Sequence, residues 1–171
     1  VSIREAETIN PDQTIDIAVD VADAKPRRMG FGAELQSTDG LSLSAFWMHR
    51  NLLGGAERLR FDGEVTGLMA QSGGVDYLFS TEFIRPATLG ADTDLTLALT
   101  AERNNDPLYF QEKLSLDIGF TRQHSKTLST SFGLHLQAND VRDDFGSRDF
   151  QIVGLPLGAT LDRRDDPLAT R

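Results

Sequence analysis

The sequence of 171 residues is long enough for one domain with a sizeable core, or for part of a larger domain. Its 26 acidic residues outnumber 17 lysines and arginines, and the net charge of −9 argues against nucleic acid as the main partner. The absence of cysteine excludes disulfides, thiolate metal sites and thiol nucleophiles, and no apolar run is long enough for a transmembrane helix.

The chain opens with two segments of alternating polar and apolar residues, 1–7 and 14–23, separated by a turn-forming Asn-Pro-Asp sequence. One face of the second segment carries Ile15, Ile17, Val19 and Val21. A hairpin of this size is not stable alone, so we expect it to belong to a domain whose other elements are missing. The sequence Lys-Pro-Arg-Arg that follows predicts a short linker.

Eight further segments have the period-2 alternation of β-strands. They span residues 28–36, 41–50, 57–67, 75–85, 94–103, 111–122, 126–138 and 150–162. In the sixth segment the alternation is clear, because Leu114, Leu116, Ile118 and Phe120 are interleaved with Lys113, Ser115, Asp117 and Thr121. No segment of comparable length has helical spacing. The sequence therefore predicts an all-β fold, an antiparallel meander with hairpin connections.

Two architectures fit this pattern. Strands of a soluble sandwich have about 5–6 residues, whereas a membrane-spanning strand needs about 9–11. The predicted segments have nine to thirteen residues, and their polar faces combine charged residues with glycines, as in a water-filled barrel lumen. The sequence thus favours a membrane-spanning β-barrel over a sandwich. Residues 139–148 are predicted to form a longer acidic outer loop.

Several short motifs, taken in order, resemble the outer-membrane assembly superfamily that includes BamA, TamA and the two-partner secretion transporters. A first strand GFGAELQ is followed by a turn with Asn51-Leu52-Leu53-Gly54, and a late turn reads DRRDDPL. The resemblance covers nearly the whole chain and is closest to the TamA branch. It implies that residues 1–25 are the C-terminal hairpin of a POTRA domain, the periplasmic module that precedes such barrels. Residues 26–171 would then be the first eight strands of the barrel.

The chain begins at Val1 without a methionine and stops within a charged stretch, which also indicates a fragment of a larger protein. Because an excised part of a barrel has open strand edges, we expect the fragment to self-associate.

The resemblance further implies two groups of functional residues. The first barrel strand would form a lateral seam at which client strands pair with an exposed edge; it comprises Arg28, Met29, Gly30, Phe31, Gly32, Ala33, Glu34, Leu35 and Gln36. Its two glycines weaken the strand, although glycines that only permit curvature would give the same pattern. The periplasmic turn motifs comprise Asn51, Leu52, Leu53, Gly54, Asp162, Arg164, Asp165, Pro167 and Leu168.

The function implied is non-enzymatic assembly or translocation of β-rich outer-membrane or autotransporter clients, by edge-strand templating and lateral opening of the barrel. The location implied is the bacterial outer membrane, with the hairpin in the periplasm, where a periplasm-spanning inner-membrane protein could be a further partner. Two alternatives stay open at this point. One is a two-partner secretion pore that exports an unfolded exoprotein, and the other is a soluble β-sandwich binding module.

The sequence predicts no cofactor and no metal site. Arginines interleaved with the carboxylates of residues 162–166 oppose a bound cation. Residues 139–149 match a calcium loop only loosely, because Arg142 occupies a ligand position. The histidines His49, His124 and His135 lie on separate segments without metal-ligand spacing. No nucleotide-binding or nucleophile motif is present, so we do not expect an enzyme.

Overall fold

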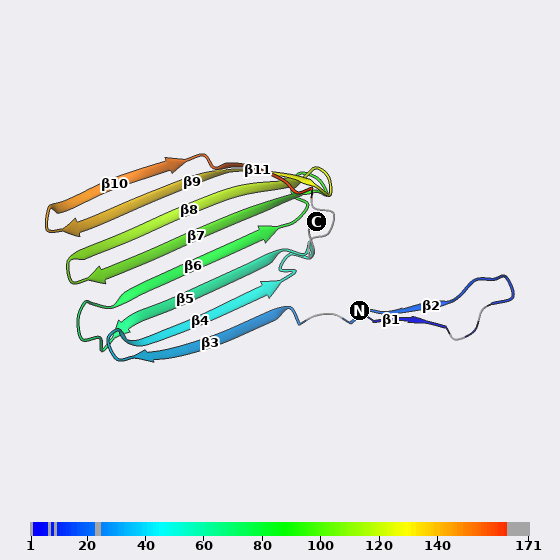
Figure 1. The fold of residues 1–171 in the computed structure, drawn as a ribbon, viewed down its shortest axis with the longest axis horizontal. Coiled ribbons are helices and arrows are strands. Elements are labelled where there is room, and N and C mark those ends of the chain that lie inside the picture. The colour runs from blue at the N-terminus through cyan, green and yellow to red at the C-terminus, as the bar shows by residue number, and fades with distance from the viewer. Residues whose placement is uncertain (1, 7, 9, 23–24, 164–171) are drawn as a thin grey trace.

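The computed structural model describes residues 2–6, 8, 10–22 and 25–163, and the regular elements of these residues are all β-strands (Figure 1). A short N-terminal hairpin consists of β1 (Ser2–Glu5) and β2 (Ile17–Asp20). The main sheet consists of β3 (Arg27–Gln36), β4 (Gly40–Arg50), β5 (Arg58–Leu68), β6 (Asp76–Arg85), β7 (Thr93–Asp106), β8 (Tyr109–Gln123), β9 (Leu128–Asp143), β10 (Gly146–Gly154) and β11 (Leu157–Leu161). None of the described residues forms a helix long and apolar enough to cross a membrane.

The N-terminal hairpin is antiparallel, with Ile3 opposite Val19 and Arg4 opposite Ala18. On one face Arg4 forms an ion pair with Asp20, whereas Ile3, Ile17 and Val19 are exposed. In the described part of the chain, β1 and β2 contact no strand except each other. The predicted hairpin is therefore present, with shorter strands than the sequence indicated. Its membership of a domain spanning residues 1–25 stays a prediction.

The main sheet is a meander in which β3 to β9 pair in chain order. Both β10 and β11 pair with β9, so they continue the sheet as one interrupted edge strand. The interruption falls at Leu155 and Pro156, where proline has no N–H to offer, but the Pro156 carbonyl accepts a hydrogen bond from Gly133 N at 2.9 Å. The predicted all-β antiparallel meander is confirmed, and this bent edge strand corresponds to the eighth predicted segment.

The predicted acidic loop at residues 139–148 is wrong. β9 continues to Asp143 and β10 begins at Gly146, which is opposite Asp143, so only two residues form the turn. The Asp143 carboxylate accepts a hydrogen bond from Phe145 N at 2.9 Å and pairs with Arg148. Charged residues favour turns when considered locally, but here the long strand β8 supplies backbone partners that extend β9 into a charged stretch.

Each strand has one apolar and one polar side, and the register puts the apolar sides of the strands on the same face of the sheet. Phe61, Thr81, Leu99, Leu116, Leu136 and Val153 oppose one another in turn across β5 to β10. We call this side the apolar face. The opposite side, the polar face, carries the Arg58, Arg60, Glu102, Lys113, Asp117 and His135 side chains.

No second layer of structure covers the apolar face among the described residues. Phe31 and Leu157 of this face are 83% and 78% exposed. Across the described ranges the only buried hydrophobic residues are Met48 and Val141, and both lie on the polar face. Figure 1 shows one curved sheet rather than two packed sheets. The sandwich alternative is therefore wrong, because a sandwich buries its leucine and phenylalanine rows between two sheets.

The connections divide between the two ends of the sheet. Residues 51–57, 86–92 and 124–127 lie at the near end, where β3 begins and from which the N-terminal hairpin extends (Figure 1). Residues 37–39, 69–75, 107–108 and 144–145 lie at the far end.

Candidate functional site

The nine residues predicted to form a seam, 28–36, all lie in β3, which is the first strand of the sheet. Every residue of β3 pairs with β4, from Arg27 opposite His49 to Gln36 opposite Gly40. Its other edge has no partner among the described residues, and only Gly30 of the strand is partly covered. The unpaired backbone groups of such an edge can hydrogen-bond to an added strand.

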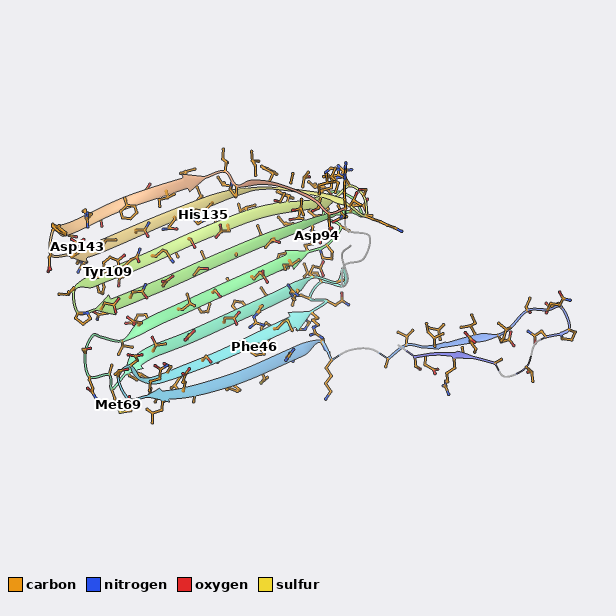
Figure 2. All side chains as sticks on the ribbon, in the orientation of Figure 1. Phe46, Met69, Asp94, Tyr109, His135 and Asp143 are labelled. Atoms are coloured by element: carbon orange, nitrogen blue, oxygen red, sulfur yellow. The ribbon has the colours of Figure 1, made fainter. Side chains whose placement is uncertain are left out.

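The near half of β3 is held on the polar face by Phe46 of β4 (Figure 2). A Cβ atom on Gly30 would overlap the Phe46 ring, so the absence of a side chain at this position allows the ring to approach the β3 backbone. The guanidinium groups of Arg28 and Arg60 lie 5.8 Å and 4.5 Å from the centre of this ring. Arg60 also forms an ion pair of 2.5 Å with Asp62. The glycine thus has a packing role that sequence reasoning missed.

The predicted turn motif Asn51-Leu52-Leu53-Gly54 lies in the near-end loop of residues 51–57. Asn51 and Gly54 have positive φ angles of 58° and 92°, a conformation that asparagine and glycine tolerate better than other residues. The Asn51 side chain accepts a hydrogen bond from Ala56 N at 2.9 Å, and Asn51 N donates to the carbonyl of Glu57 at 2.6 Å. Asn51, the first residue of the loop, is therefore hydrogen-bonded to the last two residues of the loop.

Glu57 organises the same loop and was not predicted. Glu57 is 3% exposed, and its carboxylate accepts hydrogen bonds from Gly55 N at 2.9 Å and from Leu53 N at 3.2 Å. Hydrogen bonds from the backbone N–H groups of Glu57, Gly55 and Leu53, with a smaller contribution from the charge of Arg85, hold the pKa of this carboxyl below its usual range. The signal in the sequence was an acidic residue two positions after the Gly54-Gly55 pair.

The second predicted turn motif is only partly described. Asp162 N donates a hydrogen bond of 2.7 Å to the carbonyl of Thr127, which ties the end of β11 to the near-end turn before β9. Arg164, Asp165, Pro167 and Leu168 lie outside the described residues.

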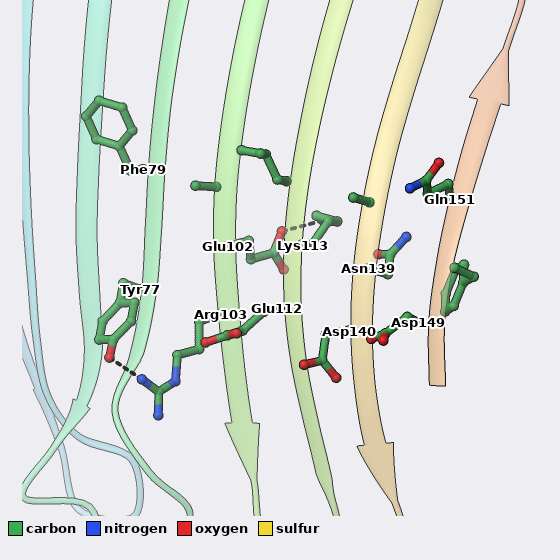
Figure 3. A pocket seen from close by; sticks show the side chains of 14 residues that line it. Tyr77, Phe79, Glu102, Arg103, Glu112, Lys113, Asn139, Asp140, Asp149 and Gln151 are labelled. Carbon is green, nitrogen blue, oxygen red and sulfur yellow. Dashed lines mark hydrogen bonds and ion pairs between the residues drawn. The ribbon is translucent and has the colours of Figure 1, made fainter. Parts of the chain in front are cut away.

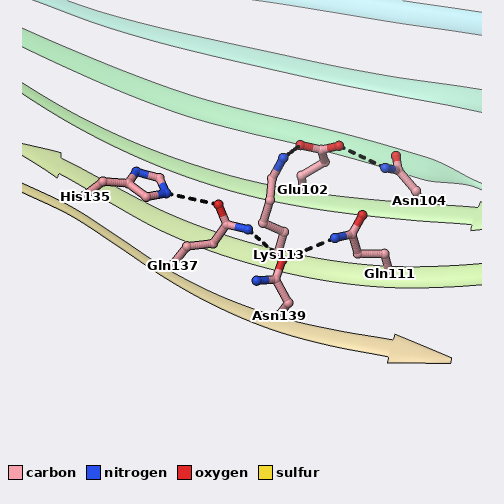
Figure 4. A network of polar contacts seen from close by, with 7 residues as sticks. All are labelled: Glu102, Asn104, Gln111, Lys113, His135, Gln137 and Asn139. Carbon is pink, nitrogen blue, oxygen red and sulfur yellow. Dashed lines mark hydrogen bonds and ion pairs between the residues drawn. The ribbon is translucent and has the colours of Figure 1, made fainter. Parts of the chain in front are cut away.

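A chain of polar contacts runs along the polar face of β7 to β9 (Figure 4). His135 contacts Asp117 at 2.6 Å and Gln137 at 3.1 Å, and Gln137 donates to Asn139 at 2.9 Å. The same network holds an ion pair of Glu102 with Lys113 and hydrogen bonds from Asn104 and Gln111. Sequence alternation placed these residues on one face, but only the register shows which of them meet. Among the described residues, no three His, Asp or Glu side chains are placed to hold a metal ion.

Three features define the class of protein. Most strands of the sheet have ten or more residues, no described residues cover the apolar face, and the polar face is hydrogen-bonded. This sheet is part of the wall of an outer-membrane β-barrel, with its apolar face toward lipid. The Omp85 superfamily domain matches residues 51–170, and the chain belongs to that superfamily. Its members are outer-membrane proteins that assemble or translocate other proteins, and they are not enzymes.

Among solved structures, the chain is similar to the crystal structure of BamA from Haemophilus ducreyi lacking POTRA domains 1–3, with a TM-score of 0.60. The sequence identity is 14%, so the likeness establishes the fold alone. The match covers 99% of this chain and 36% of that BamA chain, so the chain spans about a third of its length. No curated protein matches the chain. The predicted superfamily is confirmed, while closeness to the TamA branch stays a prediction.

Proposed function

We propose that this chain is the client-pairing part of an assembly or translocation factor in the bacterial outer membrane. The observation that carries the proposal is β3, which is the first strand after the N-terminal hairpin and whose outer edge has no partner among the described residues. A strand of a β-rich client added to that edge would form hydrogen bonds with the free backbone N–H and C=O groups of β3. Templating of this kind needs no chemical reaction. The hairpin end would face the periplasm, from which clients arrive.

The packing of β3 supports a seam that opens from one side. Its near half is held by the Phe46 ring and two arginines, whereas no aromatic or ionic contact of Ala33, Glu34, Leu35 or Gln36 reaches β4 in the described residues. The paired strand β4 also shows a register irregularity between Leu41 and Leu43, where it faces β5 at the far end. We infer that the far half of β3 separates first and accepts the client.

Site-specific cross-linking tests the proposal in the full-length protein that contains this chain. A cysteine at Ala33 of β3 should form a disulfide with a cysteine in the terminal strand of a stalled outer-membrane client. The matched cysteine at Thr100, on the polar face of the interior strand β7, should not. Cross-links at Thr100 alone would indicate a client threaded through the lumen and would favour a secretion pore. Assembly of the client without any cross-link along β3 would contradict the proposal.

A further inference from the structure

The polar face of β3 carries two glycines that differ in how they are covered. Gly30 lies opposite Phe46 and under its ring, and it is the only residue of this strand that is partly buried. Gly32 lies opposite Ser44. Apart from the adjacent residues of β3, a Cβ atom on Gly32 would meet only the Ser44 hydroxyl oxygen within 4 Å. The second glycine therefore leaves a gap in the edge strand, next to a ring that covers the first.

The neighbouring side chains leave this gap open. Glu34, the next residue on the polar face of β3, accepts a hydrogen bond of 2.8 Å from Gln36, on the side away from Gly32. Ser44 of the paired strand reaches the gap only with its hydroxyl group, and it is too short to cover a glycine as Phe46 does. The gap at Gly32 is thus accessible from the unpaired edge of the sheet.

The gap is one end of a hollow of about 310 Å³ on the polar face of β3 to β6. Phe46 lines the hollow on one side, together with Arg60 and Asp62. Glu64 and Leu78, which oppose each other on β5 and β6, line it farther from the edge. The hollow therefore combines an aromatic ring with hydrogen-bonding groups. Such a lining suits an aromatic side chain that has a polar tip.

Another hollow lies on the apolar face, but it does not border the edge strand. It has a volume of about 830 Å³ and is lined by residues of β6 to β10, including Phe79, Ala101 and Leu114 (Figure 3). β6 lies three strands from β3, so a strand added to β3 would not reach this hollow. The hollow at Gly32 is the one that a client at the candidate seam would meet.

The Phe46 ring is already fixed in the position where a second ring would contact it. The guanidinium carbons of Arg60 and Arg28 lie 4.5 Å and 5.8 Å from the centre of the ring. Arg60 is in turn held by hydrogen bonds of 2.7 Å and 2.5 Å to the Asp62 carboxylate. Because the ring is ordered before any client arrives, contact with it costs little further conformational entropy.

A strand added to β3 would place one side chain directly opposite Gly32 and on the same face. An aromatic ring at that position would lie across the glycine from the open edge, as Phe46 lies across Gly30 from β4. Positions two residues apart on one face of a strand are about 7 Å apart, so the two rings would come within the range of aromatic pairs. Covering an edge glycine with a cross-strand ring is a general way to fix strand register.

We propose that β3 selects client strands by an aromatic side chain that lies over Gly32 and packs beside the Phe46 ring. This inference rests on the proposed function, because it requires a client strand paired with β3. Only one residue of the added strand can lie opposite Gly32, so the aromatic residue sets the register of the client. Tyrosine fits best, since its hydroxyl group extends toward the polar lining of the hollow.

Disulfide scanning in the full-length protein tests the inference from the side of the client. The protein carries a cysteine at Ala33, and an outer-membrane client carries one tyrosine on the lumen-facing side of its terminal strand and single cysteines at successive positions. The strongest cross-link should form at the client residue adjacent to the tyrosine. Moving the tyrosine by two residues should move the strongest cross-link by two residues. Replacing the tyrosine with alanine should lower the yield by about two- to tenfold, the scale of one aromatic pair.

Two variants of the protein test the site itself through the ratio of cross-link yields for the tyrosine and alanine clients. Phe46→Leu removes the ring and should bring this ratio close to one, whereas the matched control Phe61→Leu, on the apolar face, should leave it unchanged. Gly32→Val closes the gap, with its Cβ atom 2.6 Å from a Ser44 hydroxyl group that can rotate away. It should abolish the preference for tyrosine while the alanine client still cross-links.

The outcomes separate this inference from the proposed function. Cross-links to β3 at a position that does not follow the tyrosine would overturn the inference and leave the pairing of clients with β3 intact. A preference for tyrosine that persists in both Phe46→Leu and Gly32→Val would overturn it as well. The absence of any cross-link along β3 would contradict the proposed function, and the inference with it.

Discussion

Gly30 lies opposite Phe46, and because glycine has no side chain, the Phe46 ring can pack against the edge strand of this sheet. The ring lies against the glycine backbone and between two guanidinium groups, so it links β3 to the polar face through packing and cation–π attraction. A glycine in a strand is generally unfavourable, and its cost is offset here by the close approach of the ring.

We expect Gly30→Val to destabilise the barrel by about 1–3 kcal/mol, because the Phe46 ring must move away from the new Cβ atom. Gly63→Val is the matched control, since its Cβ atom points into open space and valine favours strands. Urea denaturation in detergent measures both. Equal stabilities of the two variants would show that the ring contact contributes nothing.

Glu57 gives the near-end loop a defined dependence on pH. Its pKa is lowered from an ordinary value of 4.5, so the charged carboxylate stabilises the folded loop above that value. This stabilisation is lost as the pH falls below 4.5 and through the lowered pKa of the folded state.

Hydrogen exchange of the Leu53 and Gly55 amides should therefore accelerate relative to other loops when the pH falls below 4.5, after correction for the intrinsic rate. Glu57→Gln should show fast exchange at neutral pH and no acid-dependent step. An acid-dependent step of unchanged size in Glu57→Gln would assign the effect to another group.

At the scale of a strand, alternation decides which substitutions the barrel accepts. Leu99 and Thr100 are adjacent in β7, and their side chains lie on the apolar and polar faces. The apolar face can be solvated only by lipid, whereas the polar face already holds an ion pair of Glu102 with Lys113. A charge is therefore costly on one side of the strand and acceptable on the other.

Leu99→Lys should lower the stability of the membrane-inserted protein by about 2–4 kcal/mol if the row lies near the centre of the bilayer. Thr100→Lys in the same strand should change it by much less. Folding titrations in lipid vesicles provide the comparison. A larger cost for Thr100→Lys would reverse the assignment of the two faces.

At the scale of the whole molecule, two long edges remain open. β3 at one side and β10 with β11 at the other have no outer partners among the described residues, and the apolar face is uncovered between them. Nothing in this arrangement provides a self-sufficient core, because the sheet buries only two hydrophobic side chains.

The isolated 171-residue chain should consequently require detergent and form dimers or larger assemblies through its edges. Light scattering in buffer with and without dodecyl maltoside measures its mass. A monodisperse monomer in plain buffer would contradict the assignment of the apolar face to lipid.

Much of the fold could be predicted because alternation along a strand is a local property. The alternation from Leu114 to Phe120 predicts a strand with one apolar and one polar face, whatever strands lie beside it. The motif from Asn51 to Gly54 predicts a turn, because asparagine and glycine tolerate positive φ angles. The extension of β9 through Val141 to Asp143 could not be predicted in this way. There the local preference of Asn and Asp for turns was overridden by pairing with β8.

The sequence by itself determined most of the strands and their two faces, since these depend on residue types at fixed spacing, and its short motifs carried the resemblance to the superfamily. Only the tertiary structure decided which side chains meet. Gly30 lies against the Phe46 ring, and the row of opposing residues from Tyr77 to Asp149 crosses five strands, because the register brings together residues far apart in the sequence. The Glu57 carboxylate accepts hydrogen bonds from the backbone N–H groups of its own loop. Register depends on backbone hydrogen bonds summed over whole strands, and no short segment of sequence contains that sum.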